Sequence, residues 1–231
     1  MTVQWISERA DSRIGTLDDA IVKQHREEAS ATRSAAVRAR HEFEVLATLH
    51  AKMPAAFSVP RPLSLEGGTL TLEYATGTPL DVLIREYKRE RNAVEELREP
   101  LRRAGLWLRE MQKATRTGHH GDYWPGNIFI DADRVQVIDF EGYREDADPA
   151  EDVAYFLLQL KLLMPRHQRL VPALRQAFLD GYGVVDADAL KRCTRVRAQH
   201  LLDRNAPAKH SFLIRVWMRR TLRNTVAESL R

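Results

Sequence analysis

The spacing of apolar residues divides this chain into a strand-rich first part and a helix-rich remainder. Near the start, apolar and polar residues alternate with a period of two, which is typical of strands with one buried face. A Gly67-Gly68 pair separates two of these stretches in the manner of a tight turn. The stretches predicted as strands are 2–8, part of 10–19, 20–23, 63–65 and 70–74.

One helix interrupts these strands. From about residue 32 to residue 50 the apolar positions change to helical spacing, and Ala39, Phe43, Leu46 and Leu49 form one stripe. Glu42 lies at the border of that stripe, so its carboxylate needs a cation close by. Lys23, the only lysine before Lys52, ends the preceding strand and is the natural partner.

The remainder of the chain is predicted to be mostly helical. A 4-3-4-3 spacing of apolar residues predicts a long buried helix around 97–111, and a second core helix follows Asp148-Pro149. The residues of these two stripes are Leu97, Leu101, Ala104, Leu108 and Met111, then Val153, Phe156, Leu157, Leu160 and Leu163. Three further helices are predicted at 166–183, 187–203 and 209–230.

Between the two core helices lies the segment with the most distinctive chemistry, HGDYWPGNIFIDADRVQVIDFEG, residues 120–142. Its centre reads as a β-hairpin with a turn at 131–133. Asp122 and Asn127 precede the first strand, and Asp139 follows the second. Because a hairpin returns its two ends to the same place, these three oxygen-bearing side chains are expected to cluster.

The three side chains suit phosphoryl transfer. Asn127 and Asp139 offer hard oxygen ligands of the kind that Mg²⁺ takes together with nucleotide phosphates. Asp122 then remains to orient an attacking hydroxyl or to accept its proton. His-Gly-Asp alone carries little information, but the five-residue step to Asn127, the hairpin and the closing aspartate make a much rarer combination.

The motif H-G-D-x-x-x-x-N followed by I-D-F resembles the aminoglycoside phosphotransferase (APH) family, small-molecule kinases that are related to protein kinases. The resemblance implies an α+β, two-lobed protein-kinase-like fold, in which a small N-terminal β-sheet lobe with one long helix precedes a mainly helical C-terminal lobe. We place the N-lobe at 1–75 and the C-lobe at 76–231. ATP and Mg²⁺ are the implied cofactors.

The resemblance also assigns roles to residues. Lys23 takes the place of the phosphate-binding lysine, and Glu42, in HEFEVLATL, matches the helix glutamate that pairs with it. In a segment that resembles the hinge between the lobes, the backbone of Glu73, Tyr74 and Ala75 is expected to bind adenine. Asp152 resembles the helix aspartate that braces the catalytic loop, which is a structural role.

The departures from protein kinases favour a small-molecule acceptor. The sequence has no G-x-G-x-x-G loop, Trp124 stands where protein kinases usually carry a lysine, and no long activation segment follows Asp139. We therefore expect a Mg-dependent kinase that transfers the γ-phosphate of ATP to a hydroxyl of a small, sugar-like molecule. A nucleotide-binding pseudokinase that acts as a scaffold is the less favoured alternative, because Lys23, Glu42 and the hairpin residues are all present.

Composition sets limits on the class of protein. With 231 residues, 44% hydrophobic and 29% charged, the chain is long and apolar enough for a globular core. No run of about 20 apolar residues is present, the N-terminus does not read as a secretory signal, and the single Cys193 cannot form an internal disulfide. These features predict a cytoplasmic protein, and we expect no nucleic acid partner.

Charge is distributed unevenly and bears on the acceptor. Residues 191–231 hold eleven Lys/Arg and two acids, a net +9, so residues 1–190 carry 4 − 9 = −5. A basic surface attracts anions, which favours an acidic saccharide of the lipopolysaccharide type, a lipid-linked sugar, or peripheral contact with an anionic inner membrane face. A polycationic aminoglycoside is the alternative acceptor if these arginines point elsewhere, and a merely solvated basic face also remains open.

Overall fold

A computed structural model describes residues 2–9, 11–27, 33–90, 92–116, 118–203 and 212–228. The chain forms two compact units: residues 1–77 with 129–143, and residues 78–128 with 144–231. The first unit therefore includes most of the predicted hairpin and Asp139, whereas Asp122 and Asn127 belong to the second. Each unit is described by itself.

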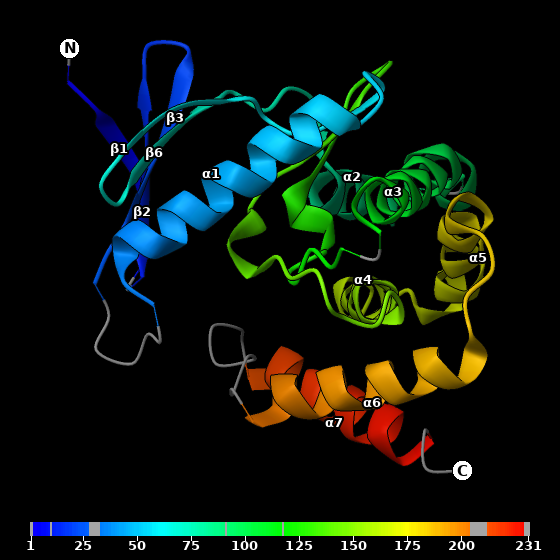
Figure 1. Ribbon diagram of the computed structural model, residues 1–231. Helices are drawn as coiled ribbons and strands as arrows, with labels where there is room; N and C mark the ends of the chain where they lie inside the picture. Colours follow the sequence, from blue (N-terminus) through cyan, green and yellow to red (C-terminus); the bar gives the residue numbers. More distant parts are fainter. Residues whose placement is uncertain are drawn as a thin grey trace. The chain divides into compact units, whose positions relative to one another are not determined.

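The first unit is built on a five-stranded antiparallel sheet in the order β1-β2-β3-β6-β5, with helix α1 across one face (Figure 1). Strand β3 is central, and its Lys23 is opposite Ile14 of β2 and Leu70 of β6. The bounds are β1 Gln4–Glu8, β2 Ser12–Leu17, β3 Ala20–His25, α1 Ala35–Lys52, β5 Pro62–Glu66 and β6 Thr69–Glu73.

Helix α1 has the predicted stripe. Ala39, Leu46 and Leu49 are buried against the sheet, while Phe43 is only half-buried. Ser34 caps the helix by accepting a hydrogen bond from the Val37 amide. The buried face of α1 also contains Glu42, which is 1% exposed, so the carboxylate must be compensated inside the unit.

The predicted hairpin is present. Strand β8 (Ile128–Ile130) and strand β9 (Val135–Val137) are neighbours in a second, small sheet, and the turn between them is closed by a hydrogen bond from the Asp131 amide to the Arg134 carbonyl. Strand β4 (Phe57–Ser58) pairs in parallel with β9. A short 3-10 helix, η2 (Phe140–Gly142), follows Asp139.

The second unit is almost entirely helical. Its centre is the long helix α3, whose predicted stripe from Leu97 to Met111 is fully buried. The prediction of one helix over 166–183 was too long: a 3-10 turn covers 168–170, and α5 begins only at Val171, with Pro172 in its first turn. The bounds are β7 Thr78–Pro79, α2 Leu80–Tyr87, α3 Ala93–Thr115, η1 Pro125–Asn127, α4 Ala150–Leu163, η3 Gln168–Leu170, α5 Val171–Tyr182, α6 Ala187–Asp203 and α7 Phe212–Glu228.

Helices α6 and α7 pack against the C-terminal half of α4 through a cluster that contains Leu158, Leu162, Ala198 and Leu222. The segment predicted as helical at 209–211 lies outside the described residues, as does the side chain of Arg215. None of the helices in the described part of the chain combines the length and hydropathy needed to cross a bilayer.

Helices α3 and α5 approach each other through two glycines. A Cβ on Gly105 would overlap the Phe178 carbonyl oxygen, and a Cβ on Gly181 would overlap the Arg102 carbonyl oxygen. Since both obstacles are backbone atoms, neither can move aside cheaply. This close approach places Tyr182 of α5 within hydrogen-bond distance of Gln112 of α3, where its hydroxyl donates to Oε1 at 2.8 Å.

We predict that Gly181→Ala lowers the free energy of unfolding by about 3 kcal/mol, because overpacking outweighs the better helix propensity of alanine. Urea denaturation followed by tryptophan fluorescence, with the buried Trp107 of α3 as a reporter, measures the change. Ala173→Ser, which adds one atom at an exposed position of α5, should change stability by less than about 0.5 kcal/mol. Equal stability of the two variants would contradict the packing described here.

Candidate active site

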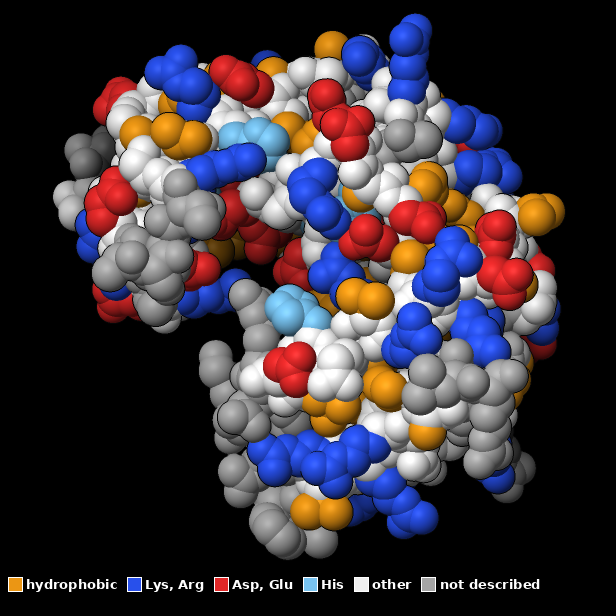
Figure 2. Space-filling view, turned by 60° about the horizontal axis from the view of Figure 1, so that its bottom comes forward, with side chains coloured by type: hydrophobic (Ala, Val, Ile, Leu, Met, Phe, Trp, Pro, Cys, Tyr) orange, Lys and Arg blue, Asp and Glu red, His pale blue; other side chains and the backbone are white. Residues whose placement is uncertain are grey.

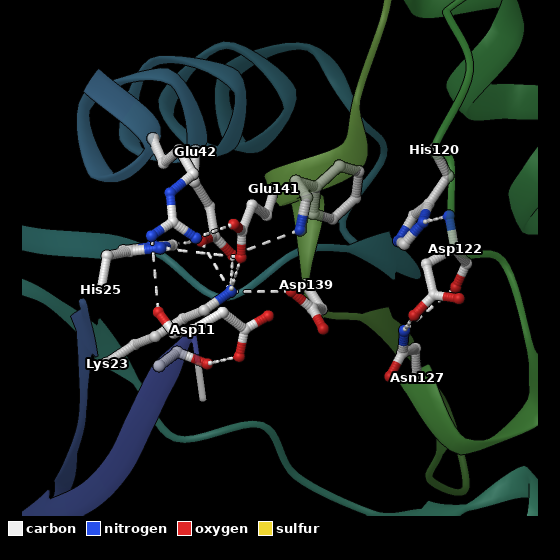
Figure 3. A network of polar contacts seen from close by, with 12 residues as sticks. Asp11, Lys23, His25, Glu42, His120, Asp122, Asn127, Asp139 and Glu141 are labelled. Atoms are coloured by element: carbon white, nitrogen blue, oxygen red, sulfur yellow. Dashed lines mark hydrogen bonds and ion pairs between the residues drawn. The ribbon is translucent and has the colours of Figure 1, made fainter. Parts of the chain in front are cut away.

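The first unit contains a buried charge network centred on Lys23 (Figure 3). The Lys23 Nζ atom lies 2.8 Å from Glu42 Oε2, 2.7 Å from Asp139 Oδ1 and 3.6 Å from Glu141 Oε2. The predicted ion pair between Lys23 and Glu42 is therefore confirmed. The contact from Lys23 to Asp139 was not predicted, and it links the strand lysine to the end of the hairpin.

The Glu42 carboxylate has several hydrogen-bond partners. Lys23 and the ring of His25 bond to its oxygens, and its Oε1 accepts the backbone N–H of Phe140 at 3.2 Å. Burial alone would raise the pKa of Glu42, but the charge of Lys23 and the hydrogen bond from His25 outweigh burial and lower that pKa. Burial likewise opposes the charge of Lys23, and the carboxylates of Glu42, Asp139 and Glu141 raise its pKa above the usual value.

A second layer of charge supports this network. Arg38, one turn before Glu42 on α1, bonds to Glu141 Oε1 at 2.7 Å. His25, two residues after Lys23 on the same face of β3, lies 3.2 Å from Glu42 and 3.6 Å from Glu141. Sequence reasoning missed all three residues. Strand and helix periodicity could have signalled His25 and Arg38, but nothing in the sequence marked Glu141.

Ligand atoms of His25, Glu42 and Glu141 lie within 4.8 Å of one another, as they would around a cation. However, the ammonium group of Lys23 already lies beside both carboxylates. A divalent ion at that point would face this positive charge at short range. We therefore assign the trio to the charge network and not to a metal site.

Asp139 has an unusual backbone conformation. Its φ of 71° lies in the left-handed region, which costs an ordinary residue on the order of 1 kcal/mol and which aspartate tolerates better than most. The conformation ends β9 and starts η2, so that the carboxylate meets Lys23 while the next amide, that of Phe140, meets Glu42. The Asp139 side chain is 28% exposed, so its carboxylate remains accessible to a ligand.

In the second unit, the loop around Asp122 is held from below by Asp152, as predicted. Asp152 is fully buried at the start of α4 and accepts the backbone N–H groups of His120 at 2.7 Å and Gly121 at 3.1 Å. Its Oδ1 also lies 3.1 Å from His119 Nε2. Burial opposes its charge, yet the bonds from His119 and His120 lower the pKa of Asp152.

Asp122 and Asn127 contact each other directly. The Asn127 amide nitrogen donates to the Asp122 carbonyl at 3.0 Å and to its carboxylate Oδ2 at 3.2 Å. Because that nitrogen is turned toward Asp122, the amide oxygen is the atom left to bind a cation. The chemistry of the donors therefore fits Mg²⁺: an amide oxygen of Asn127 and a carboxylate of Asp139 are both hard oxygen ligands.

Two residues near Asp122 were not foreseen. Burial raises the pKa of the Tyr155 phenol on α4, and the charge of Asp122 and a hydrogen bond to it act in the same direction. Arg197 of α6 places its guanidinium 5.1 Å from the Tyr155 ring centre and donates to the Gly121 carbonyl at 3.3 Å. Their sequence positions gave no signal, because only the packing of α4 against α6 brings them to the loop.

Comparison with known proteins identifies the fold. A family model described as "Phosphotransferase enzyme family" (APH) matches residues 80–194, the stretch that includes the Asp122 loop and the hairpin. Over these residues, just under half of the chain, the sequence is similar to that family. Comparison with curated protein sequences gave no significant match.

Solved structures with the same fold are found as well. Amicoumacin kinase hAmiN, in complex with AMP-PNP, Ca²⁺ and Ami, superposes with a TM-score of 0.60 at 14% identity, and the match covers 98% of this chain and 88% of that chain. Aminoglycoside phosphotransferase APH(3'')-Id from Streptomyces rimosus gives a TM-score of 0.56 at 17% identity, over 83% of this chain and 90% of that chain. The PknI kinase domain of Mycobacterium tuberculosis gives a TM-score of 0.50 at 15% identity, over 85% of this chain and 94% of that chain. The predicted protein-kinase-like fold, a small sheet unit and a mainly helical unit, is thus confirmed.

The adenine-binding role predicted for the backbone of Glu73, Tyr74 and Ala75 stays a prediction. Glu73 ends β6, and Tyr74 is 49% exposed. The first of the two segments that form the first unit ends shortly afterwards, at Gly77.

We predict that Asp152→Asn lowers the free energy of unfolding by about 3 kcal/mol, since an amide nitrogen would face backbone N–H groups that need an acceptor. Glu151→Gln is the matched control in the same helical turn. The Glu151 side chain is 28% exposed, and its ion pairs with Arg144 and Arg197 should be worth about 1 kcal/mol or less. Urea denaturation monitored by circular dichroism compares the two, and equal losses would show that Asp152 is not the anchor.

Proposed function

We propose that this APH-like protein is a Mg²⁺-dependent kinase that transfers the γ-phosphate of ATP to a hydroxyl of a small, sugar-like molecule. One observation carries the proposal: Lys23 is bonded at once to Glu42 and to Asp139. This arrangement keeps a cation and a metal-binding carboxylate together at the end of the hairpin. Phosphoryl transfer depends mainly on such positioning and charge neutralisation.

Each residue has one task in the proposed reaction. Lys23, aimed by Glu42, neutralises phosphate oxygens of the nucleotide, and the Glu73–Ala75 backbone binds its adenine. Asn127 and Asp139 hold Mg²⁺, which neutralises charge on the transferring group. Asp122 orients the acceptor hydroxyl and takes its proton. The proposal requires the residues of both units to act on one nucleotide.

Charge near the Asp122 loop supports the proposed acceptor class. Arg197 lies next to the Asp122 loop and donates to the Gly121 carbonyl, and the exposed Arg144 bonds to Glu151 nearby. Cations beside Asp122, the proposed catalytic base, repel a polycationic aminoglycoside and attract an anionic group. We therefore favour a neutral or acidic saccharide, including one carried by a lipid at an anionic membrane surface.

The test is transfer of radiolabelled phosphate from ATP to a panel of neutral sugars, acidic saccharides and aminoglycosides, with and without Mg²⁺. We predict that Asp122→Asn lowers turnover by about 10²- to 10⁴-fold while nucleotide affinity stays the same, because only proton transfer and hydroxyl orientation are lost. Asp139→Asn should instead weaken binding of Mg·ATP.

Asp133→Asn, at an exposed position of the hairpin turn, is the charge-matched control and should behave like the wild type. Equal loss of nucleotide binding in the Asp122 and Asp139 variants would contradict the separate roles. Transfer to aminoglycosides in preference to acidic or neutral saccharides would contradict the proposed acceptor class.

A further inference from the structure

The second unit contains a cavity of about 320 Å³ that the proposed reaction does not use. It lies among α4, α5, α6 and α7, and residues of all four helices line it. The volume is at the lower end of the range for small-molecule sites in proteins. A ligand of this cavity would be small, or would insert only one end.

Three cations line the cavity, each from a different helix: Lys161 of α4, Arg175 of α5 and Lys191 of α6. No acidic residue is among its described lining residues. Among the described residues, the Lys161 ammonium group donates a single hydrogen bond, a long one of 3.4 Å to the neutral hydroxyl of Thr225. Within the described part of the chain, the side chains of Arg175 and Lys191 form no hydrogen bond or ion pair with any residue.

The two described acids that are adjacent in sequence to a lining residue do not line the cavity. They are Asp186 and Asp188, which flank Ala187 at the start of α6. Asp186 caps the helix instead, since its Oδ1 accepts the Ala189 amide at 2.8 Å. Three like charges around one small space repel each other, and an anion placed among them would relieve that repulsion.

The rest of the lining is largely apolar. Leu157, Leu158 and Leu190 contribute side chains, together with Val171 and Ala187. A bare inorganic anion would leave these surfaces in contact with water, whereas an aliphatic group would cover them. The cavity thus combines a cationic part with an apolar wall.

The cavity is separate from the Asp122 loop. Helices α4 and α6 run side by side, and Tyr155 of α4 meets Arg197 of α6 beside that loop. Lys161 and Lys191 each lie six residues from this meeting point, which is about 9 Å along either helix. Figure 2 shows Lys and Arg side chains gathered on the face of this unit that the C-terminal helices form.

We propose that this cavity binds an amphiphilic anion, a phosphate or carboxylate headgroup attached to an aliphatic chain. Arg175 and Lys191, both exposed, capture the headgroup at the rim, and Lys161 attracts it from within. Leu157, Leu158 and Leu190 cover the first carbons of the chain. This inference does not depend on the proposed kinase activity, because it concerns different residues and a binding event.

Isothermal titration calorimetry of the whole protein with monomeric decyl phosphate tests the proposal. We expect one binding site per chain, and at least about tenfold weaker binding by the double variant Arg175→Gln/Lys191→Gln, since hydrogen bonds to charged groups contribute enough for that change. Arg223→Gln, an exposed cation of α7 that does not line the cavity, should bind within about twofold of the wild type.

Two further probes test the two halves of the ligand separately. Inorganic phosphate and the neutral decyl maltoside should each bind at least about tenfold more weakly than decyl phosphate, because each lacks one half of the proposed chemistry. Equal binding by either probe, or by the double variant, would overturn the proposal. Sedimentation with vesicles that contain phosphatidic acid then distinguishes the two possible sources of the anion. If the protein binds these vesicles and the binding requires Arg175 and Lys191, the ligand is a lipid headgroup in a membrane. If the protein binds decyl phosphate but not the vesicles, the ligand is a free amphiphile.

Discussion

The buried ion pair between Lys23 and Glu42 is the interaction on which the first unit depends. Both groups are removed from water, and either one alone would cost several kcal/mol. The pair is tolerated because every charge has a partner: Glu42 bonds to Lys23, His25 and the Phe140 amide, while Lys23 also meets Asp139. The central strand β3, the long helix α1 and the end of the hairpin are thereby fixed to one another.

The second unit also contains a buried acid whose charge must be compensated by hydrogen bonds. Asp152 is an acceptor for two backbone amides of the Asp122 loop and for His119, so α4 fixes the start of that loop. Close packing of α3 and α5 at Gly105 and Gly181 supports the same helical core. In both units, a polar group that could not remain buried alone holds the residues proposed for catalysis.

The sequence was sufficient for features that rest on local periodicity or on a compact motif. Strand alternation and the helix stripe predicted the pair of Lys23 and Glu42, and the hairpin was evident from its β-branched runs. Contacts made by packing were not visible: Arg197 reaches the Gly121 carbonyl only because α6 lies against α4, and Asp139 meets Lys23 through a left-handed backbone turn. The start of α5 was also misjudged, because a 3-10 turn at 168–170 precedes the helix and its sequence does not distinguish it from a first helical turn.

The central claim is that the buried lysine exists to hold nucleotide phosphates. Calorimetric titration of Mg·AMP-PNP into the wild type, Lys23→Met and Lys52→Met tests it most directly, since Lys52 is exposed at the end of α1 and its loss is the matched control. We expect Lys23→Met to weaken binding by about tenfold or more, as the loss of one charged hydrogen bond requires, with Lys52→Met unchanged. If folded Lys23→Met bound Mg·AMP-PNP as tightly as the wild type, the lysine would be only a structural counter-ion of Glu42 and the account would fail.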